Sequence, residues 1–339
     1  MQTRTSRENR GRSMLIDGRV EKETAEGQHR STVYLTVDGG TTNTRVHLVR
    51  DGAVVESFRA SIGAGQGDPE ALAAAVREGI HRLLDGRGLT ESDVTRIIAS
   101  GMITSEKGLC PLPHLEAPVG IAELHDAMYE TALPHISCIP FVFVRGVKIH
   151  SDDPLRADMM RGEETELMGL IRQGPAQVIL PGSHSKSVTV DEAGRIVDFS
   201  TSLTGEMLAA LSAHTILRTS VHMESACLCT DALLQGFDCC DRMGLNRSLF
   251  KVRTRDTLFG RSDDEIYSFF LGCVLCEELK GLRLCADLPV TVGGRSRLRD
   301  AICLLLKERF SIVPERVSDE AVDVSVALGA VRIYEYGKE

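Results

Sequence analysis

The sequence predicts an α/β protein in which two similar domains face a cleft. Three observations support this prediction: a unit of three short strands occurs twice, strands alternate with helices, and 339 residues suit two domains. The two units begin roughly 145 residues apart, a spacing that is too long for a solenoid repeat and suits a duplicated domain.

The first unit begins with an apolar run of β-branched residues that ends at a Gly-Gly pair. Alternating apolar residues follow, and the hairpin signal Asp51-Gly52 precedes a third apolar run. The predicted strands cover residues 32–40, 42–50 and 53–60.

The second unit has the same order of strand, turn, strand, turn and strand. Its predicted strands cover residues 176–182, 185–190 and 195–202. A helix is predicted directly afterwards over residues 203–217, with Thr204 in position to cap its first turn.

Further helices and strands complete the α/β pattern. A helix is predicted over residues 68–88, a strand over 94–102, a strand, Gly-Gly turn and helix over 287–310, and a last helix over 320–337.

The domain boundaries follow from these elements. We expect the first domain over residues 31–162 and the second over 163–339, with the last helix packing back on the first domain. Residues 1–30 are polar and lack the apolar centre of a secretory signal. We expect them to form a disordered tail, or an extension before a start at Met14.

The composition argues against several partners. A net charge of −9 repels nucleic acid and anionic membranes, and no apolar run is long enough for a membrane span. The ten Cys residues show no disulfide framework, so we expect reduced thiols and a cytoplasmic protein. The composition is also compatible with a homodimer.

The clearest motif is DGGTTNTR, which runs from Asp38 to Arg45. Its glycines permit a close backbone approach to a ligand, and the N–H groups of such a turn form an anion site. Asp38 would bind Mg²⁺ directly or through water. The alternative is an ordinary hairpin with a solvated turn. The predicted phosphate contacts are Gly39, Gly40, Thr41, Thr42 and Asn43.

Two later glycine turns are candidates for the nucleotide. The second strand unit contains PGSHSK, in which Gly182, Ser183 and Lys186 would contact phosphate. Gly293-Gly294 lies between a predicted strand and helix, where a helix N-terminus suits an anionic ligand. The alternative for Gly293-Gly294 is plain packing of strand against helix.

An acid-rich segment, residues 150–167, is the candidate for the catalytic base. Phosphoryl transfer to a hydroxyl needs a base within hydrogen-bond reach, and Glu163 is the first choice because it begins a predicted helix. Glu164, Asp152 and Asp153 are rivals, and all four acids could simply cap the helix.

Arginines near the two motifs are candidates for a substrate carboxylate, because guanidinium groups bind carboxylates in a bidentate way. Surface solvation is the alternative for each. The predicted substrate contacts are Arg45, Arg161 and Glu164, with Arg145 and Arg156 as further candidates.

Five segments together resemble one enzyme family, the 2-dehydro-3-deoxygalactonokinases. They are DGGTTNTR, IIASGMITSEKG, MRGEETELMG, ILPGSHSKSVTV and DFSTSLTGEM, and the resemblance runs from about Val33 to Ala330. It implies duplicated ribonuclease-H-like domains of the actin-like ATPase type flanking a nucleotide cleft. It also implies transfer of the γ-phosphoryl of MgATP to the 6-hydroxyl of 2-dehydro-3-deoxy-D-galactonate, in D-galactonate catabolism. Gly162-Glu163 resembles the Gly-Asp pair that holds the base in related kinases.

Three alternatives remain open from the sequence. The first is a kinase of the same fold that acts on another sugar or sugar acid. The second is a non-catalytic actin-like protein that senses nucleotide. The third, a zinc-binding regulator, would use the Cys pairs Cys227/Cys229 and Cys239/Cys240.

Overall fold

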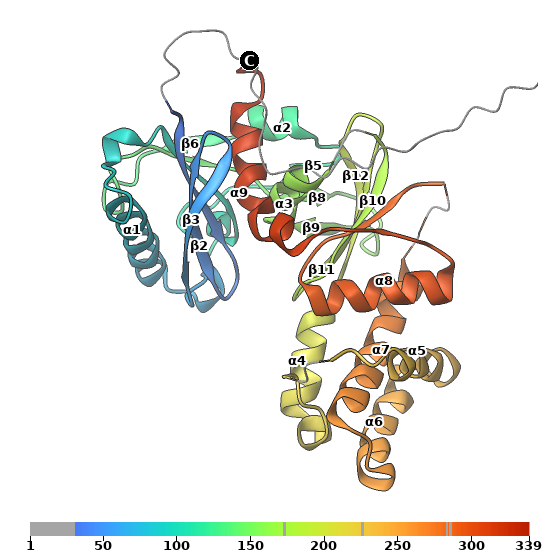
Figure 1. The fold of residues 1–339 in the computed structure, drawn as a ribbon. Helices are drawn as coiled ribbons and strands as arrows, with labels where there is room; N and C mark the ends of the chain where they lie inside the picture. The colour runs from blue at the N-terminus through green and yellow to red at the C-terminus, as the bar shows by residue number, and fades with distance from the viewer. Residues whose placement is uncertain (1–30, 172–173, 225–226, 283, 285–286, 339) are drawn as a thin grey trace, which may run out of the picture.

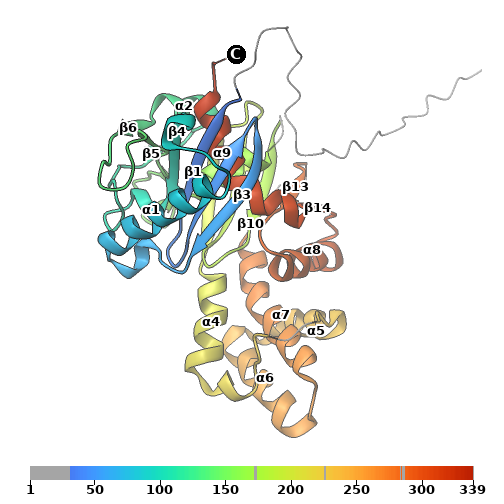
Figure 2. The ribbon, with the colours of Figure 1, turned by 60° about the vertical axis from the view of Figure 1, so that its left-hand side comes forward.

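Two β-sheets lie on either side of a central helix pair, and a group of helices extends from the second sheet (Figures 1 and 2). This computed structural model describes residues 31–171, 174–224, 227–282, 284 and 287–338. The tail predicted over residues 1–30 lies outside the described residues.

The first sheet has the order β3-β2-β1-β4-β7-β6. β1, β2 and β3 pair antiparallel, whereas β1, β4 and β7 pair parallel. Helix α1 (Pro69–Asp85), which begins at its cap Asp68, packs against β2 and β3. The strands are β1 (Val33–Gly39), β2 (Thr44–Arg50), β3 (Ala53–Ala60), β4 (Arg96–Gly101), β6 (Tyr129–Thr131) and β7 (Phe141–Phe143).

The second sheet repeats this order as β12-β11-β10-β13-β14, again with three antiparallel and then parallel strands. The repeated order 3-2-1-4-5 is the duplicated ribonuclease-H-like topology of the actin-like ATPases, so the predicted fold class is confirmed. The strands are β10 (Ala176–Leu180), β11 (Ser185–Val190), β12 (Ile196–Ser202), β13 (Val290–Val292) and β14 (Glu315–Arg316).

A small third sheet packs beside the second one. It consists of β5 (Leu115–Glu116), β8 (Val147–Ile149) and β9 (Asp158–Met160). Thr201 on β12 donates its backbone N–H and its hydroxyl to the Asp158 carboxylate, at 2.8 and 2.7 Å. These bonds attach the third sheet to the second.

The central helices are α3 (Glu163–Leu170) and α9 (Asp319–Glu335). They approach closely because glycines face each other: a Cβ at Gly169 would lie 2.0 Å from the Ser325 carbonyl oxygen. α9 also lies against β1 and β4, and the Tyr34 hydroxyl donates to Glu335 at 3.1 Å. The last helix therefore contacts the first sheet although it follows the second in the chain (Figure 1).

A helical group is inserted between β12 and β13 (Figure 1). α7 is buried along most of its length, and Cys273 and Cys276 on it pack with Cys239 and Cys240 of α5. Among the described helices, none is long and apolar enough to cross a membrane. The group contains α4 (Thr204–His214), α5 (Thr230–Met243), α6 (Leu245–Phe259) and α7 (Asp263–Gly281), followed after β13 by α8 (Ser296–Phe310).

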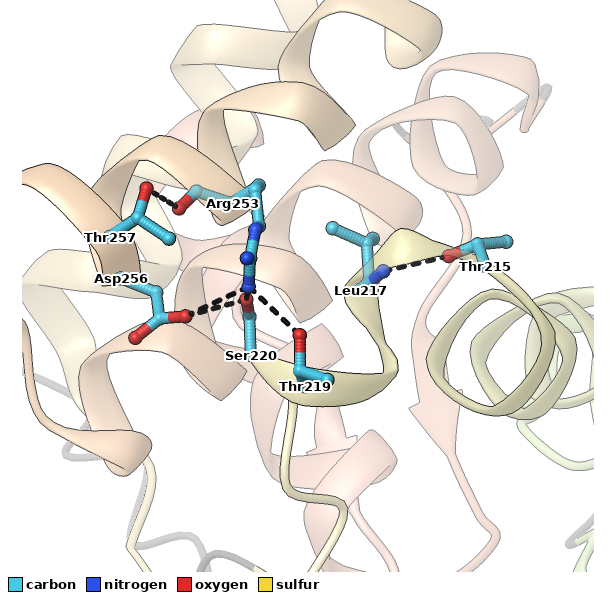
Figure 3. A network of polar contacts seen from close by, with 7 residues as sticks. All are labelled: Thr215, Leu217, Thr219, Ser220, Arg253, Asp256 and Thr257. Carbon is cyan, nitrogen blue, oxygen red and sulfur yellow. Dashed lines mark hydrogen bonds and ion pairs between the residues drawn. The ribbon is translucent and has the colours of Figure 1, made fainter.

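A polar network fixes η4 (Ile216–Thr219), the short helix that follows α4, to α6 (Figure 3). Arg253 of α6 donates to the Thr219 and Ser220 hydroxyls at 2.8 and 2.9 Å, and the Ser220 hydroxyl donates to Asp256 at 2.7 Å. The remaining short helices are α2 (Ile121–Asp126), η1 (Ala64–Gln66), η2 (Glu91–Asp93), η3 (Met102–Thr104) and η4 (Ile216–Thr219).

Candidate functional site

Asp38 lies at the carboxyl end of β1, where β1 and the parallel strand β4 end at the same edge. Its partner across the antiparallel pair is Arg45, and the Arg45 guanidinium lies 3.0 Å from the Asp38 carboxylate. Gly101 ends β4 beside Gly39. A Cβ on Gly101 would lie 2.6 Å from the Gly39 carbonyl oxygen. A side chain at residue 101 would therefore disturb this edge.

The segment that follows β3 packs against the turn after Asp38 and is hydrogen-bonded to its backbone. The Gly40 N–H donates to the Asn43 carbonyl at 2.9 Å, and Ala64 donates to the Gly40 carbonyl at 3.1 Å. The side chains of Thr41 and Thr42 remain exposed. The turn therefore has a fixed backbone and presents hydroxyl groups outward.

Helix α3 begins directly beside the end of β4. Its N-cap Gly162 has φ 115°, a conformation that favours glycine, and a Cβ there would lie 3.2 Å from the Gly101 Cα. Burial raises the pKa of Asp38, and the nearby charge of Glu163 raises it further, whereas Arg45 lowers it. The structure therefore brings Asp38, Arg45 and Glu163 together.

Glu164 and Arg161 face protein groups. The fully buried Glu164 carboxylate accepts from the Gly162 N–H at 2.7 Å and from the Thr165 hydroxyl at 3.0 Å. Its pKa is raised to about 7 by burial and by Glu163. The Arg161 guanidinium donates to the carbonyl and hydroxyl oxygens of Thr104 at 2.7 and 2.6 Å and to the Leu112 carbonyl at 3.1 Å.

The remaining candidates for the base and for the substrate contacts are exposed to solvent or bonded to other parts of the protein. Asp152, Asp153 and Arg156 are exposed in the loop between β8 and β9, and Asp153 accepts from the Leu155 N–H at 3.0 Å. Arg145 donates to the Ala127 carbonyl at 2.8 Å.

The second glycine turn meets the start of α4. The Gly205 N–H donates to the Gly182 carbonyl at 3.1 Å, and the Glu206 N–H donates to the Ser183 carbonyl at 3.2 Å. The His184 ring lies 3.0 Å from the Glu206 carboxylate, and both side chains are exposed. The turn and the first turn of α4 therefore form one continuous surface.

The Gly293-Gly294 turn lies against the same surface. A Cβ at Gly294 would lie 2.5 Å from the Pro181 carbonyl oxygen. Gly293 donates its N–H to the Ile179 carbonyl at 2.8 Å. The predicted nucleotide turns at Gly182 and at Gly293 are thus neighbours.

Lys186 is buried on β11, and its ammonium group is bonded to other protein groups. Its ammonium group donates to the Thr201 hydroxyl at 2.6 Å and to the Met159 carbonyl at 3.1 Å. Both partners belong to the junction between the second and third sheets.

Comparison with known proteins identifies the family. The model of the 2-keto-3-deoxy-galactonokinase family matches residues 38–324. The chain belongs to this family. It is a family of carbohydrate kinases, and the family predicted from the sequence motifs is confirmed.

Three similar proteins agree with this assignment. A probable 2-dehydro-3-deoxygalactonokinase of Rhizobium meliloti is 32% identical over 56% of this chain, and the match spans 59% of that relative's length. The 2-dehydro-3-deoxygalactonokinase of Escherichia coli is 27% identical, with 74% and 80% of the two chains matched. The crystal structure of a Sinorhizobium meliloti protein assigned to the same activity has a TM-score of 0.69 and 26% identity, over 90% of this chain and 98% of that one.

Sequence reasoning missed two residues that lie beside these candidates. Glu166 lies one helical turn after Glu163, and its pKa is raised to about 8 by burial and by the charges of Glu163 and Asp38. The spacing of three residues on one helix could have indicated it. The fully buried Arg299 donates to the Gly294 carbonyl at 3.1 Å and to Asp319 at 2.6 Å, a link that depends on tertiary structure.

Metal ligands in the described part of the chain are sparse. No group of three or more His, Cys, Asp or Glu side chains there could hold a metal ion. The nine Cys residues in that part are free thiols. These observations give no support to the zinc-binding alternative.

Proposed function

We propose that the protein transfers the γ-phosphoryl group of ATP to the 6-hydroxyl of 2-dehydro-3-deoxy-D-galactonate, as a step of D-galactonate catabolism. The observation that carries this proposal is the cluster of Asp38, Glu163 and Glu166 beside the Gly39–Asn43 turn. Family membership supports the sugar acid as the acceptor. Action in the cytoplasm and a homodimer remain predictions from composition.

The charges around Asp38 favour a divalent cation. Burial and mutual repulsion raise the pKa values of Asp38 and Glu166, so these carboxyls gain stability from added positive charge. Since the described protein groups do not offer three grouped ligands, Mg²⁺ would be held by Asp38 with water and phosphate oxygens. When bound, Mg²⁺ would neutralise charge on the phosphates.

The glycine turns fit the phosphates of ATP. A Cβ at Gly182 would meet only the His184 carbonyl oxygen, at 4.0 Å, so the space beside this residue is open. Gly293 and Gly294 precede the N-terminus of α8, a position that favours anionic groups. We assign the second turn, with Ser183, and the Gly293-Gly294 turn to the nucleotide, and the exposed Thr41 and Thr42 to the transferred phosphate.

Glu163 is the proposed base. Its carboxylate accepts from the Arg161 N–H at 3.0 Å, which orients it at the first turn of α3. In this position it would take the proton of the attacking hydroxyl group while Asp38 stays paired with Arg45. We assign Arg161 and Glu164 to supporting the start of α3, and the partly exposed Arg45 to the substrate carboxylate.

Two matched variants test this assignment. We expect Glu163→Gln to reduce kcat by about 10²–10⁴-fold while MgATP binding persists, because the amide cannot accept the proton. Asp38→Asn should weaken the binding of MgATP more than that of ATP without metal. Isothermal titration calorimetry and ADP release measure the two effects, with the exposed Asp152→Asn as the control. A Glu163→Gln variant with near wild-type turnover would show that the base is elsewhere.

A further inference from the structure

We infer that Glu278 of α7 is a positioning residue for the nucleotide, because it holds the Gly182 turn and the first turn of α4 in one arrangement. This inference rests on the proposed function. Glu278 is 7% exposed and lies about 100 residues along the chain from the turn that it supports. The helical group thus contributes directly to the geometry of the glycine turns.

The Glu278 carboxylate contacts both parts of this surface. It accepts a hydrogen bond from the hydroxyl of Thr204, the first residue of α4. It also bonds the side chain of Ser185, whose hydroxyl accepts from the Gly182 N–H at 3.4 Å. One carboxylate therefore connects the turn to the start of the helix.

The Glu278 carboxylate is held by hydroxyl groups and not by a cation. Within the residues that the structure describes, no Lys or Arg forms an ion pair with Glu278. Burial raises its pKa, and the hydroxyl groups of Thr204 and Ser185 oppose that rise. A buried carboxylate stabilised only by hydroxyl donors depends on the geometry of those donors.

We therefore expect loss of Glu278 to weaken the binding of the nucleotide and to leave the binding of the sugar acid unchanged. The Gly182 turn is already bonded to α4 through Gly205, so the loss of Glu278 releases both together. The segment that follows α4 remains fixed to α6 by the network around Arg253 (Figure 3). Asp38 belongs to β1 and Glu163 begins α3, so both lie on other elements than the turn and the helices that Glu278 connects.

The test compares Glu278→Leu, which removes both acceptor atoms, with Glu278→Gln, which keeps the shape and one acceptor. We expect Glu278→Leu to raise the KM for ATP at least about tenfold and Glu278→Gln to give a smaller rise, with the KM for the sugar acid within about twofold of wild type. The exposed neighbour Glu277→Gln serves as the control and should leave both values unchanged.

Two results would overturn the inference. One is a wild-type KM for ATP in both Glu278 variants, and the other is an equal rise of both KM values, which indicates general destabilisation. Calorimetric titration with MgADP needs no sugar, so it tests Glu278 even if no sugar is phosphorylated. In that case the proposed substrate fails while the positioning role is still decided.

Discussion

Buried carboxyl groups in the first turn of α3 make the protein sensitive to pH. The pKa of Glu166 is raised to about 8 because the side chain is largely buried and lies near the charges of Glu163 and Asp38. In the unfolded chain the same group has a pKa near its ordinary value of about 4.3. The folded protein therefore holds a proton that the unfolded chain has already lost at neutral pH.

This difference predicts a loss of stability with rising pH. Between the unfolded and folded pKa values the native state binds more protons, so the free energy of unfolding falls until the pH passes about 8. We expect the melting temperature of the metal-free protein to fall between pH 6.5 and 9, and to fall less in Glu166→Gln. His47 and His114 have folded pKa values lowered to about 4, so they oppose this trend only where their unfolded forms titrate, near pH 6.5, and their contribution is constant above about pH 7.5.

A thermal scan at several pH values checks this prediction, with the exposed Glu192→Gln as the control. Equal pH slopes in the wild type and in Glu166→Gln would contradict the assigned proton. Added Mg²⁺ should reduce the wild-type slope, because a bound cation favours the ionised carboxyls.

At the residue scale, the sequence predicts which side chains meet only when they lie close together in the chain. Asp38 and Arg45 lie seven residues apart across a hairpin, so the predicted strands bring them together, although their ion pair itself was not predicted. Lys186 could not be assigned in this way. It lies beside the glycine turn in sequence, but its ammonium group contacts Thr201 and Met159, which only the folded sheets bring near.

At the element scale, α3 has a fixed start because two glycines from different elements touch. Gly162 at φ 115° approaches Gly101 at the end of β4, and this contact places Glu163 beside Asp38. The hairpin strands could be predicted from Gly turns and alternating apolar residues. The pairing of α3 with α9 could not, because it depends on close contacts between residues far apart in the chain.

The contact between Gly162 and Gly101 gives a prediction for α3. We expect Gly162→Ala to cost about 1–3 kcal/mol of stability through backbone strain, and to reduce kcat because α3 must shift. Gly174→Ala is the matched control: Gly174 has φ 105°, but a Cβ there would meet no atom within 4 Å. Gly174→Ala should lose a similar amount of stability and keep the wild-type kcat.

Thermal melting and ADP release measured on both variants separate the two effects. Equal losses of kcat in Gly162→Ala and Gly174→Ala would show that the position of α3 does not govern catalysis.

At the scale of the whole molecule, the two sheets share one topology but present different chemistry. The end of the first sheet gathers carboxylates, whereas the end of the second gathers glycine turns and the N-termini of α4 and α8. This division supports a kinase that holds the acceptor at one domain and the nucleotide at the other. The duplication itself was predictable, because both strand units are visible in the sequence.

The acceptor preference tests the central claim most directly. The measurement is ADP release from MgATP by the full-length protein with 2-dehydro-3-deoxy-D-galactonate, its gluconate epimer, galactonate or glucose as acceptor. We predict turnover confined to 2-dehydro-3-deoxy-D-galactonate. Turnover with glucose alone, or no turnover with any acceptor while MgATP still binds, would contradict the account.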